Sequence, residues 1–84
     1  MEPKEQFGVN LRRLRDAAGL TQLDLALECD MDMAEISRYE LGQRDPRLST
    51  IARLAAGLDL DTAELVRGVA PSDRGRRRRP RKPR

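Results

Sequence analysis

Histidine and tryptophan are absent from this 84-residue sequence, and cysteine, phenylalanine and tyrosine occur once each. A single cysteine excludes a disulfide within the chain, and the lack of histidine removes the other common zinc ligand. The sequence also offers no nucleophile–base arrangement and no glycine-rich loop that could hold a phosphate. We therefore expect no metal, no cofactor and no enzymatic activity.

Long apolar runs are missing as well. No stretch is apolar for long enough to span a bilayer, and the first residues do not resemble a signal peptide. These absences lead us to expect a soluble cytoplasmic protein without a membrane segment.

The length allows one small domain with a small core. Charged residues make up 37% of the chain and aromatic residues 2%, so aliphatic side chains must supply most of that core. Cys29 is expected to fill part of it rather than to react, because a free cysteine usually behaves as a small buried hydrophobe.

The net charge of +3 hides two parts of opposite sign. Residues 1–70 carry nine basic and thirteen acidic side chains, a net charge of −4, whereas residues 71–84 carry eight basic side chains and one acid, a net charge of +7. The second part has almost no apolar residues, so burial cannot offset the entropy cost of ordering it. The sequence therefore predicts a folded domain over residues 1–70 and a disordered arginine-rich tail over residues 71–84.

Two helix-start signals stand close together in the first part. Thr21 is followed three residues later by an aspartate, and Asp32 is followed at the same spacing by a glutamate, as in a capping box. This spacing predicts helices over residues 22–28 and 33–41, joined by a tight turn. Such a pair is typical of a helix-turn-helix.

Apolar residues at helical spacing predict three further helices. The first covers residues 4–18 and the fourth covers residues 48–58, while a short fifth begins after Asp61, where Glu64 would complete a third capping box. Together these elements predict a compact all-α domain of five helices. The apolar side chains expected in its core are Phe7, Leu11, Leu14, Ala18, Leu25, Ala26, Met31, Ile36, Tyr39, Leu48, Ile51, Leu54, Ala55, Leu58, Leu60 and Leu65.

Four segments carry a resemblance to a known family. GLTQxxLA at residues 19–26 and ISRYExGxRxP at residues 36–46 resemble the phage-repressor helix-turn-helix family (XRE/Cro type). FGxxLRxLR at residues 7–15 resembles the first helix of that family, and LSTIARLAAGLDLDTAEL at residues 48–65 resembles its last two helices. The resemblance implies a repressor-like DNA-binding domain in which the predicted helix over residues 33–41 enters the major groove of DNA.

The outward face of that helix supplies the candidate base contacts. Arg38 can bond both major-groove acceptors of guanine, while Met33 or Ala34 can touch a thymine methyl group. The candidate base contacts are Met33, Ala34, Ser37 and Arg38.

Other residues are candidates for contacts with the DNA backbone. Arg44 and Arg47 lie in the loop after the predicted recognition helix and can reach a phosphate. The resemblance implies that Gln22 touches the backbone, and that Arg15 forms a salt bridge with Glu40 that aims Arg15 at a phosphate as well. The alternative for each arginine is a solvated surface charge.

The tail has three interpretations. It is a solvated segment that aids solubility, an electrostatic arm on DNA or RNA, or an arm that enters the minor groove. The electrostatic arm is favoured, because cations that neutralise phosphates raise affinity in a salt-dependent way. The cations that would act in this way are Arg76, Arg77, Arg78, Arg79, Arg81 and Lys82.

The sequence departs from the family pattern at two kinds of position. Asp30 and Asp59 stand where the family usually has a glycine with a left-handed backbone, a conformation that aspartate tolerates better than most residues. Leu23, Leu27 and Leu41 stand where relatives commonly carry polar residues. For Leu23 and Leu27 we consider either a wider buried face or a patch that contacts a protein partner.

Two functions follow from these observations. The first is a bacterial or phage-type transcriptional regulator, such as a repressor, that binds double-stranded DNA as a homodimer and is therefore associated with the nucleoid. The alternative is a protein-interaction module, an antitoxin or adaptor whose helix-turn-helix does not read bases. The acidic charge of residues 1–70 and the three unusual leucines favour this alternative.

Overall fold

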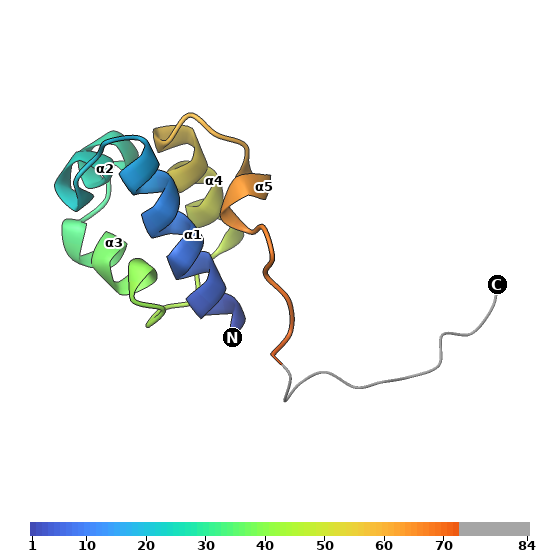
Figure 1. The fold of residues 1–84 in the computed structure, drawn as a ribbon. Coiled ribbons are helices and arrows are strands. Elements are labelled where there is room, and N and C mark those ends of the chain that lie inside the picture. Colours follow the sequence, from blue (N-terminus) through green and yellow to red (C-terminus); the bar gives the residue numbers. More distant parts are fainter. Residues whose placement is uncertain (73–84) are drawn as a thin grey trace, which may run out of the picture.

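The computed structural model describes residues 1–72, in which five helices and no strands occur. The helices are α1 (Pro3–Ala17), α2 (Gln22–Cys29), α3 (Met33–Glu40), α4 (Leu48–Gly57) and α5 (Thr62–Leu65). This arrangement confirms the predicted all-α fold, with the helix-turn-helix formed by α2 and α3 (Figure 1). Residues 73–84, with most of the predicted disordered tail, lie outside the described part.

Helix α1 connects the two halves of the domain. It packs against α3 and against α5, while α2 packs against α3 and α4, and α4 packs against α5. Figure 1 shows α2 and α3 together on one side of α1, with α5 on the other. Across residues 1–72, none of these helices has the length and apolar character that crossing a bilayer requires.

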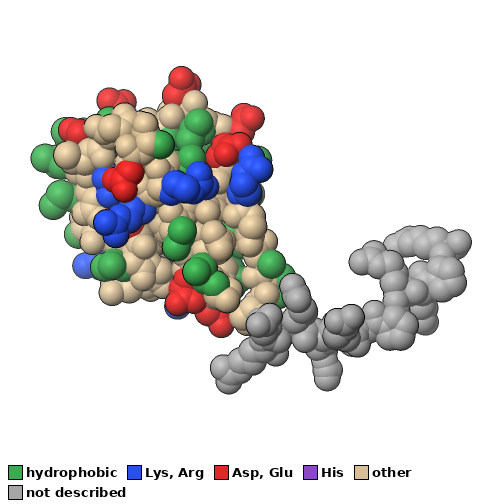
Figure 2. All heavy atoms as spheres, viewed as in Figure 1, with side chains coloured by type: hydrophobic (Ala, Val, Ile, Leu, Met, Phe, Trp, Pro, Cys, Tyr) green, Lys and Arg blue, Asp and Glu red, His purple; other side chains and the backbone are tan. Residues whose placement is uncertain are grey.

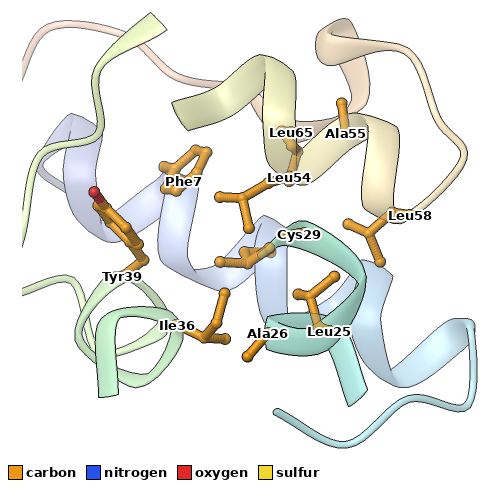
Figure 3. Packing of buried hydrophobic residues seen from close by; sticks show 11 residues of the cluster. Phe7, Leu25, Ala26, Cys29, Ile36, Tyr39, Leu54, Ala55, Leu58 and Leu65 are labelled. Carbon is orange, nitrogen blue, oxygen red and sulfur yellow. The ribbon is translucent and has the colours of Figure 1, made fainter. Parts of the chain in front are cut away.

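The core is built mainly from aliphatic side chains that all five helices contribute (Figure 3). Phe7 and Tyr39 meet edge to face, with their ring centroids 6.1 Å apart and their planes at 83°, an arrangement that aromatic rings favour. The buried hydrophobic residues are Phe7, Leu11, Leu25, Ala26, Cys29, Ile36, Tyr39, Leu54, Ala55, Leu58 and Leu65. Cys29 is thus buried, as the sequence predicted.

Capping bonds define where the two helices of the motif begin. Thr21 Oγ1 accepts a hydrogen bond from the Asp24 amide at 3.0 Å, and Asp24 Oδ2 accepts one from the Thr21 amide at 2.9 Å. At the start of α3, Glu35 Oε1 accepts a hydrogen bond from the Asp32 amide at 3.4 Å. These bonds satisfy amides that a helix start leaves without a partner. Both boxes therefore form where the sequence predicted them.

The turns after α2 and α4 have the predicted left-handed backbone. The φ angle is 54° at Asp30 and 57° at Asp59. An aspartate in this conformation carries a steric cost that a glycine would not. The family's turn geometry is therefore retained at both places, although the glycine is not.

Two glycines allow helices to approach closely. A side chain at Gly8 would overlap the backbone oxygen of Tyr39 and would stand 2.8 Å from that of Glu40. A side chain at Gly57 would overlap the sulfur of Cys29. Glycine at these positions therefore sets how closely α1 packs on α3 and α4 on α2.

Three residues expected in the core lie outside it. Leu48 is 79% exposed and Leu60 is 37% exposed, and Ala18 is exposed just beyond the end of α1. Leu48 is the first residue of α4, and helical side chains lean toward the helix N-terminus, so it projects past the end of the helix. Leu60 lies in the turn that leads to α5 rather than on a helix face.

Two expectations about the shorter helices are also wrong. Leu23 is 52% exposed and Leu27 is 73% exposed, so α2 does not have a widened buried face. The third capping box does not form at Asp61, because the Glu64 carboxylate instead accepts a hydrogen bond from the Arg67 guanidinium at 2.7 Å.

Candidate nucleic-acid interface

Helix α3 has one face in the core and one face in solvent. Ile36 is fully buried and Tyr39 is 5% exposed, which fixes the inward side. The side chains of the opposite side, which we name the α3 face, are Met33, Ala34, Ser37, Arg38 and Leu41. All of them are exposed except Ser37, which is half-buried. The structure therefore places the predicted base-contact residues together on one accessible surface.

Three arginines lie on or beside this surface. Arg38 is in α3, Arg44 is in the loop that follows it, and Arg47 immediately precedes α4, and all are exposed. Within residues 1–72, no hydrogen bond or ion pair engages the guanidinium group of Arg38, Arg44 or Arg47. Acidic and basic side chains are interspersed on the face seen in Figure 2. These arginines are therefore available to a ligand.

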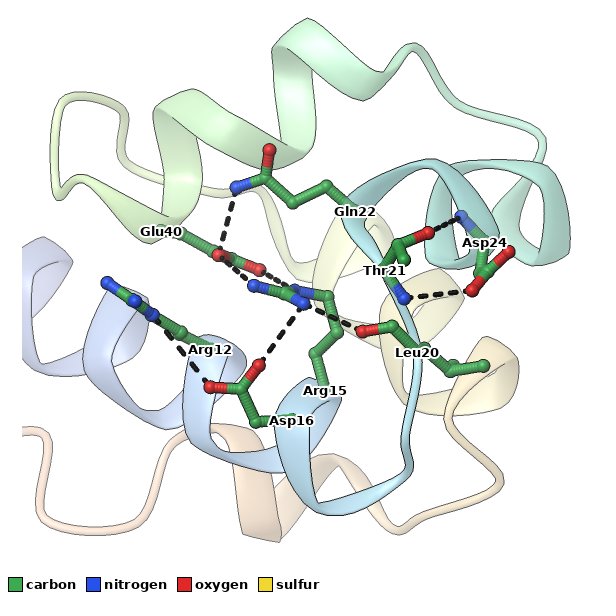
Figure 4. A network of polar contacts seen from close by, with 8 residues as sticks. All are labelled: Arg12, Arg15, Asp16, Leu20, Thr21, Gln22, Asp24 and Glu40. Atoms are coloured by element: carbon green, nitrogen blue, oxygen red, sulfur yellow. Dashed lines mark hydrogen bonds and ion pairs between the residues drawn. The ribbon is translucent and has the colours of Figure 1, made fainter.

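The Arg15 guanidinium links α1 directly to α3 and, through Glu40, to α2 (Figure 4). Its Nε donates a hydrogen bond to Glu40 Oε2 at 2.6 Å, and its Nη2 donates to Glu40 Oε1 at 3.0 Å. Gln22 Nε2 donates to the same Glu40 Oε1 at 3.1 Å, and Arg15 Nη1 donates to the Leu20 carbonyl at 2.7 Å. Residues of α1, α2 and α3 thus share one network.

The ion pair at the centre of this network is largely buried. The side chains of Arg15 and Glu40 are 11% and 4% exposed. The pKa of Arg15 is raised above its ordinary value, chiefly by the hydrogen bond to Glu40, while desolvation acts in the opposite direction. Because two nitrogens of Arg15 donate to the two carboxylate oxygens of Glu40, the network fixes the C-terminal end of α3 relative to α1.

The remaining candidates for backbone contacts are either engaged within the protein or outside the described residues. Arg15 has little exposed surface, and three of its nitrogens already donate to protein oxygens. Gln22 is half-buried at the first residue of α2, with one amide hydrogen directed at Glu40. The tail cations lie outside the described residues; they are Arg76, Arg77, Arg78, Arg79, Arg81 and Lys82.

Asn10 is a buried polar residue that the sequence analysis missed. It is 3% exposed, and its Nδ2 donates hydrogen bonds to the carbonyls of Leu65 at 2.9 Å and Arg67 at 2.8 Å. Its Oδ1 accepts a hydrogen bond from Gln6 at 3.0 Å. The burial of Asn10 could have been found in the sequence, because its position three residues after Phe7 places it on the core side of α1. Asn10 therefore ties α1 to the C-terminal end of α5.

In the part of the chain that the structure describes, no group of three or more histidine, cysteine, aspartate or glutamate side chains is arranged to hold a metal ion.

Comparison with known sequences relates these features to a family. A family profile described as "Helix-turn-helix domain" matches residues 6–67. The uncharacterized HTH-type transcriptional regulator y4dJ of Sinorhizobium fredii is 33% identical over 66 residues, which cover 79% of this chain and 86% of the relative. The control protein C.MunI of a Mycoplasma species is 31% identical over 67 residues, which cover 79% of this chain and 90% of the relative.

Solved structures show the same similarity. The restriction-modification controller protein C.AhdI from Aeromonas hydrophila superposes with a TM-score of 0.72 at 40% identity, covering 74% of this chain and 94% of the other. The clp gene regulator ClgR from C. glutamicum has a TM-score of 0.74 at 23% identity, covering 77% and 84%, which is a likeness of fold. This chain therefore belongs to the helix-turn-helix domain family of phage-repressor (XRE) type, and it is a DNA-binding transcriptional regulator rather than an enzyme.

Proposed function

We propose that the chain reads DNA sequence by placing α3 in the major groove. The observation that carries this proposal is the exposed α3 face, whose Arg38 has no ion pair within residues 1–72. The Arg38 guanidinium can donate to O6 and N7 of one guanine, which is worth about 1–3 kcal/mol of discrimination against other bases. Ser37 adds a second hydrogen-bonding group, and Met33 and Ala34 add apolar contacts.

Contacts with phosphates position α3 in the groove. Arg44 and Arg47, exposed in the loop after α3, reach the DNA backbone in this proposal. Gln22 donates its second amide hydrogen to a phosphate at the amino end of α2, where anions are favoured. We assign Arg15 a positioning role, because it holds Glu40 and, through Glu40, orients Gln22.

We further propose that the chain acts as a homodimer. Each α3 face carries only two side chains with hydrogen-bonding groups, Ser37 and Arg38, which can specify few base pairs. Two copies that read half-sites about 10 base pairs apart would double that information.

The tail is proposed to add electrostatic affinity. Residues 1–70 have a net charge of −4, which disfavours approach to DNA, whereas residues 71–84 have a net charge of +7. Counterion release by several tail cations would make the affinity fall steeply as the salt concentration rises. In this division of roles, the tail supplies affinity and the α3 face supplies specificity.

A second candidate function is a protein-interaction module. The exposure of Leu23 at 52% and of Leu27 at 73% favours it, because both side chains lie on the solvent side of α2. With Leu41, which is 65% exposed, they would provide contacts for a protein partner.

The two candidates predict different DNA binding over a series of salt concentrations. A preferred duplex is first selected from random sequences with the full chain, and binding is then measured for the full chain and for residues 1–72. We expect the shorter form to bind more weakly and with a smaller salt dependence, but to retain the sequence preference. Arg38→Ala should remove that preference, whereas Arg53→Ala, which removes a charge from α4, should leave it unchanged. A lack of sequence preference in both forms at moderate salt would favour the protein-interaction module.

A further inference from the structure

Most side chains of the α3 face cannot form hydrogen bonds. Met33 is 49% exposed and Leu41 is 65% exposed, and Ala34, which follows Met33 in the chain, is exposed as well. Within residues 1–72, α3 packs against α1 and α2 through its other side, so no described element covers these three side chains. The face therefore offers apolar surface that remains in contact with water until a ligand binds.

The surroundings of this apolar surface favour DNA as the ligand. Arg38 lies on the same face, and Arg44 and Arg47 are exposed in the segment between α3 and α4. Within residues 1–72, these three guanidinium groups have no carboxylate partner. A ligand that combines negative charge with apolar groups matches this arrangement, and duplex DNA has phosphates along its backbone and thymine methyl groups in its major groove.

We propose that Met33, Ala34 and Leu41 read thymine through its C5 methyl group, beside the guanine that Arg38 reads. This inference rests on the proposed function and specifies which bases the site selects. Thymine is the only standard base with a methyl group in the major groove, and apolar side chains recognise it there. Arg38 and Ser37 can donate to the O4 acceptor of thymine, but a hydrogen bond does not detect its methyl group, which an apolar contact does.

The spacing of the apolar residues defines the expected half-site. Ala34 is four residues before Arg38 and therefore lies next to it on the helix surface. From Met33 to Leu41 an α-helix rises about 12 Å, which corresponds to roughly three to four base-pair steps of about 3.4 Å. We therefore expect a half-site with one guanine and at least one thymine within about three base pairs of it.

Replacement of thymine by deoxyuridine tests this inference, because it removes the methyl group and leaves the base-pairing edge unchanged. Duplexes carrying the site selected by the full chain are synthesised with each thymine replaced in turn. The loss of one buried methyl contact should weaken binding about fourfold. At the position that Leu41 contacts, the Leu41→Ala variant should bind the thymine and deoxyuridine duplexes equally, and Met33→Ala should do the same at its own position.

Val66→Ala provides the matched control, because Val66 is 39% exposed at the end of α5, whereas within residues 1–72 α3 packs mainly against α1 and α2. This variant should keep the full deoxyuridine effect. A specifically bound site in which every deoxyuridine substitution changes affinity less than twofold would overturn the thymine inference and leave the proposed function standing. A full chain that selects no sequence would overturn both.

Discussion

At the scale of single residues, the contact between Arg15 and Glu40 holds the C-terminal end of α3 against α1. Glu40→Gln would leave the buried Arg15 charge with only the exposed Asp16 carboxylate, 3.3 Å from Arg15 Nη1, as a counter-ion. Breaking a buried ion pair typically costs about 3–5 kcal/mol. We expect the free energy of unfolding, measured in urea, to fall by about that amount.

The pair of Arg12 and Asp16 provides the control for this prediction. These side chains are 69% and 60% exposed and are 3.9 Å apart. Because an exposed ion pair contributes little, Arg12→Ala should cost less than about 1 kcal/mol. Equal costs for Glu40→Gln and Arg12→Ala would show that the buried network does not stabilise the domain.

The left-handed backbone at Asp30 leads to a prediction of increased rather than decreased stability. Asp30→Gly should raise the free energy of unfolding by about 0.5–1 kcal/mol, because glycine adopts a φ of 54° without a steric cost. Asp45→Gly serves as the control, since Asp45 is not among the residues with positive φ. It should be neutral or destabilising in the same urea titration. If both variants lose stability, the backbone at Asp30 is not the reason for the cost.

Cys29 is predicted to be unreactive in the folded protein. It is 3% exposed, and the pKa of its thiol is raised, chiefly by burial and further by the negative charge of Glu28, while Arg53 acts in the opposite direction. Less thiolate is then present at a given pH. At pH 8 we expect a thiol reagent to modify Cys29 much more slowly in the native protein than in denaturant. Equal rates would contradict its burial between α2 and α4.

At the scale of elements, the capping box of α2 makes a prediction about pH. The pKa of Asp24 is lowered, because its carboxylate accepts a hydrogen bond from the Thr21 amide and interacts with the Thr21 side chain. A group with a lowered pKa in the folded state stabilises the protein above its ordinary pKa of about 3.9, and this stabilisation is lost as the pH falls through the lower value. Asp24→Asn should therefore be less stable than the original chain at pH 6, and the difference should disappear in acid.

Urea unfolding at several pH values checks this prediction. The variant Thr21→Ala, which removes the other half of the box, should cost about 1 kcal/mol at pH 6. A stability difference for Asp24→Asn that persists at pH 2 would contradict the assigned role of the carboxylate.

The positions of the helices could be predicted well because each has local causes. The boxes at Thr21 and Asp32 start α2 and α3, and the spacing of apolar residues identifies their inner faces. Helical spacing does not show that a side chain at the first residue of a helix projects past the end of that helix, so the pattern places Leu48 in the core although it is exposed. Glu64 had two partners within reach, and the local pattern could not decide between them.

The site was only partly predictable for a similar reason. The outward direction of Arg38 follows from helix geometry. The resemblance indicated a salt bridge between Arg15 and Glu40, and in the structure Arg15 Nε lies 2.6 Å from Glu40 Oε2. The engagement of Gln22 with Glu40 and of Asn10 with the end of α5 depends on how distant segments meet. Such tertiary contacts leave no local signal in a single sequence.

At the scale of the whole molecule, different parts of the chain would supply specificity for DNA sequence and electrostatic affinity for DNA. Residues 1–72 hold the α3 face in a fixed orientation through the core and the Arg15 network, while the net positive charge of the chain comes from residues 71–84, which carry +7 against −4 for residues 1–70. A protein arranged in this way should bind many sequences weakly through charge and a few sequences strongly through α3.

Methylation interference on the selected duplex tests most directly whether the α3 face reads bases in the major groove. Dimethyl sulfate methylates guanine at N7 in the major groove and adenine at N3 in the minor groove, so one experiment compares the two grooves. We predict that methylation of one guanine N7 in each half-site blocks binding of the full chain, and that Arg38→Ala loses this sensitivity. Interference from adenine N3 alone, or from neither base, would contradict reading by α3.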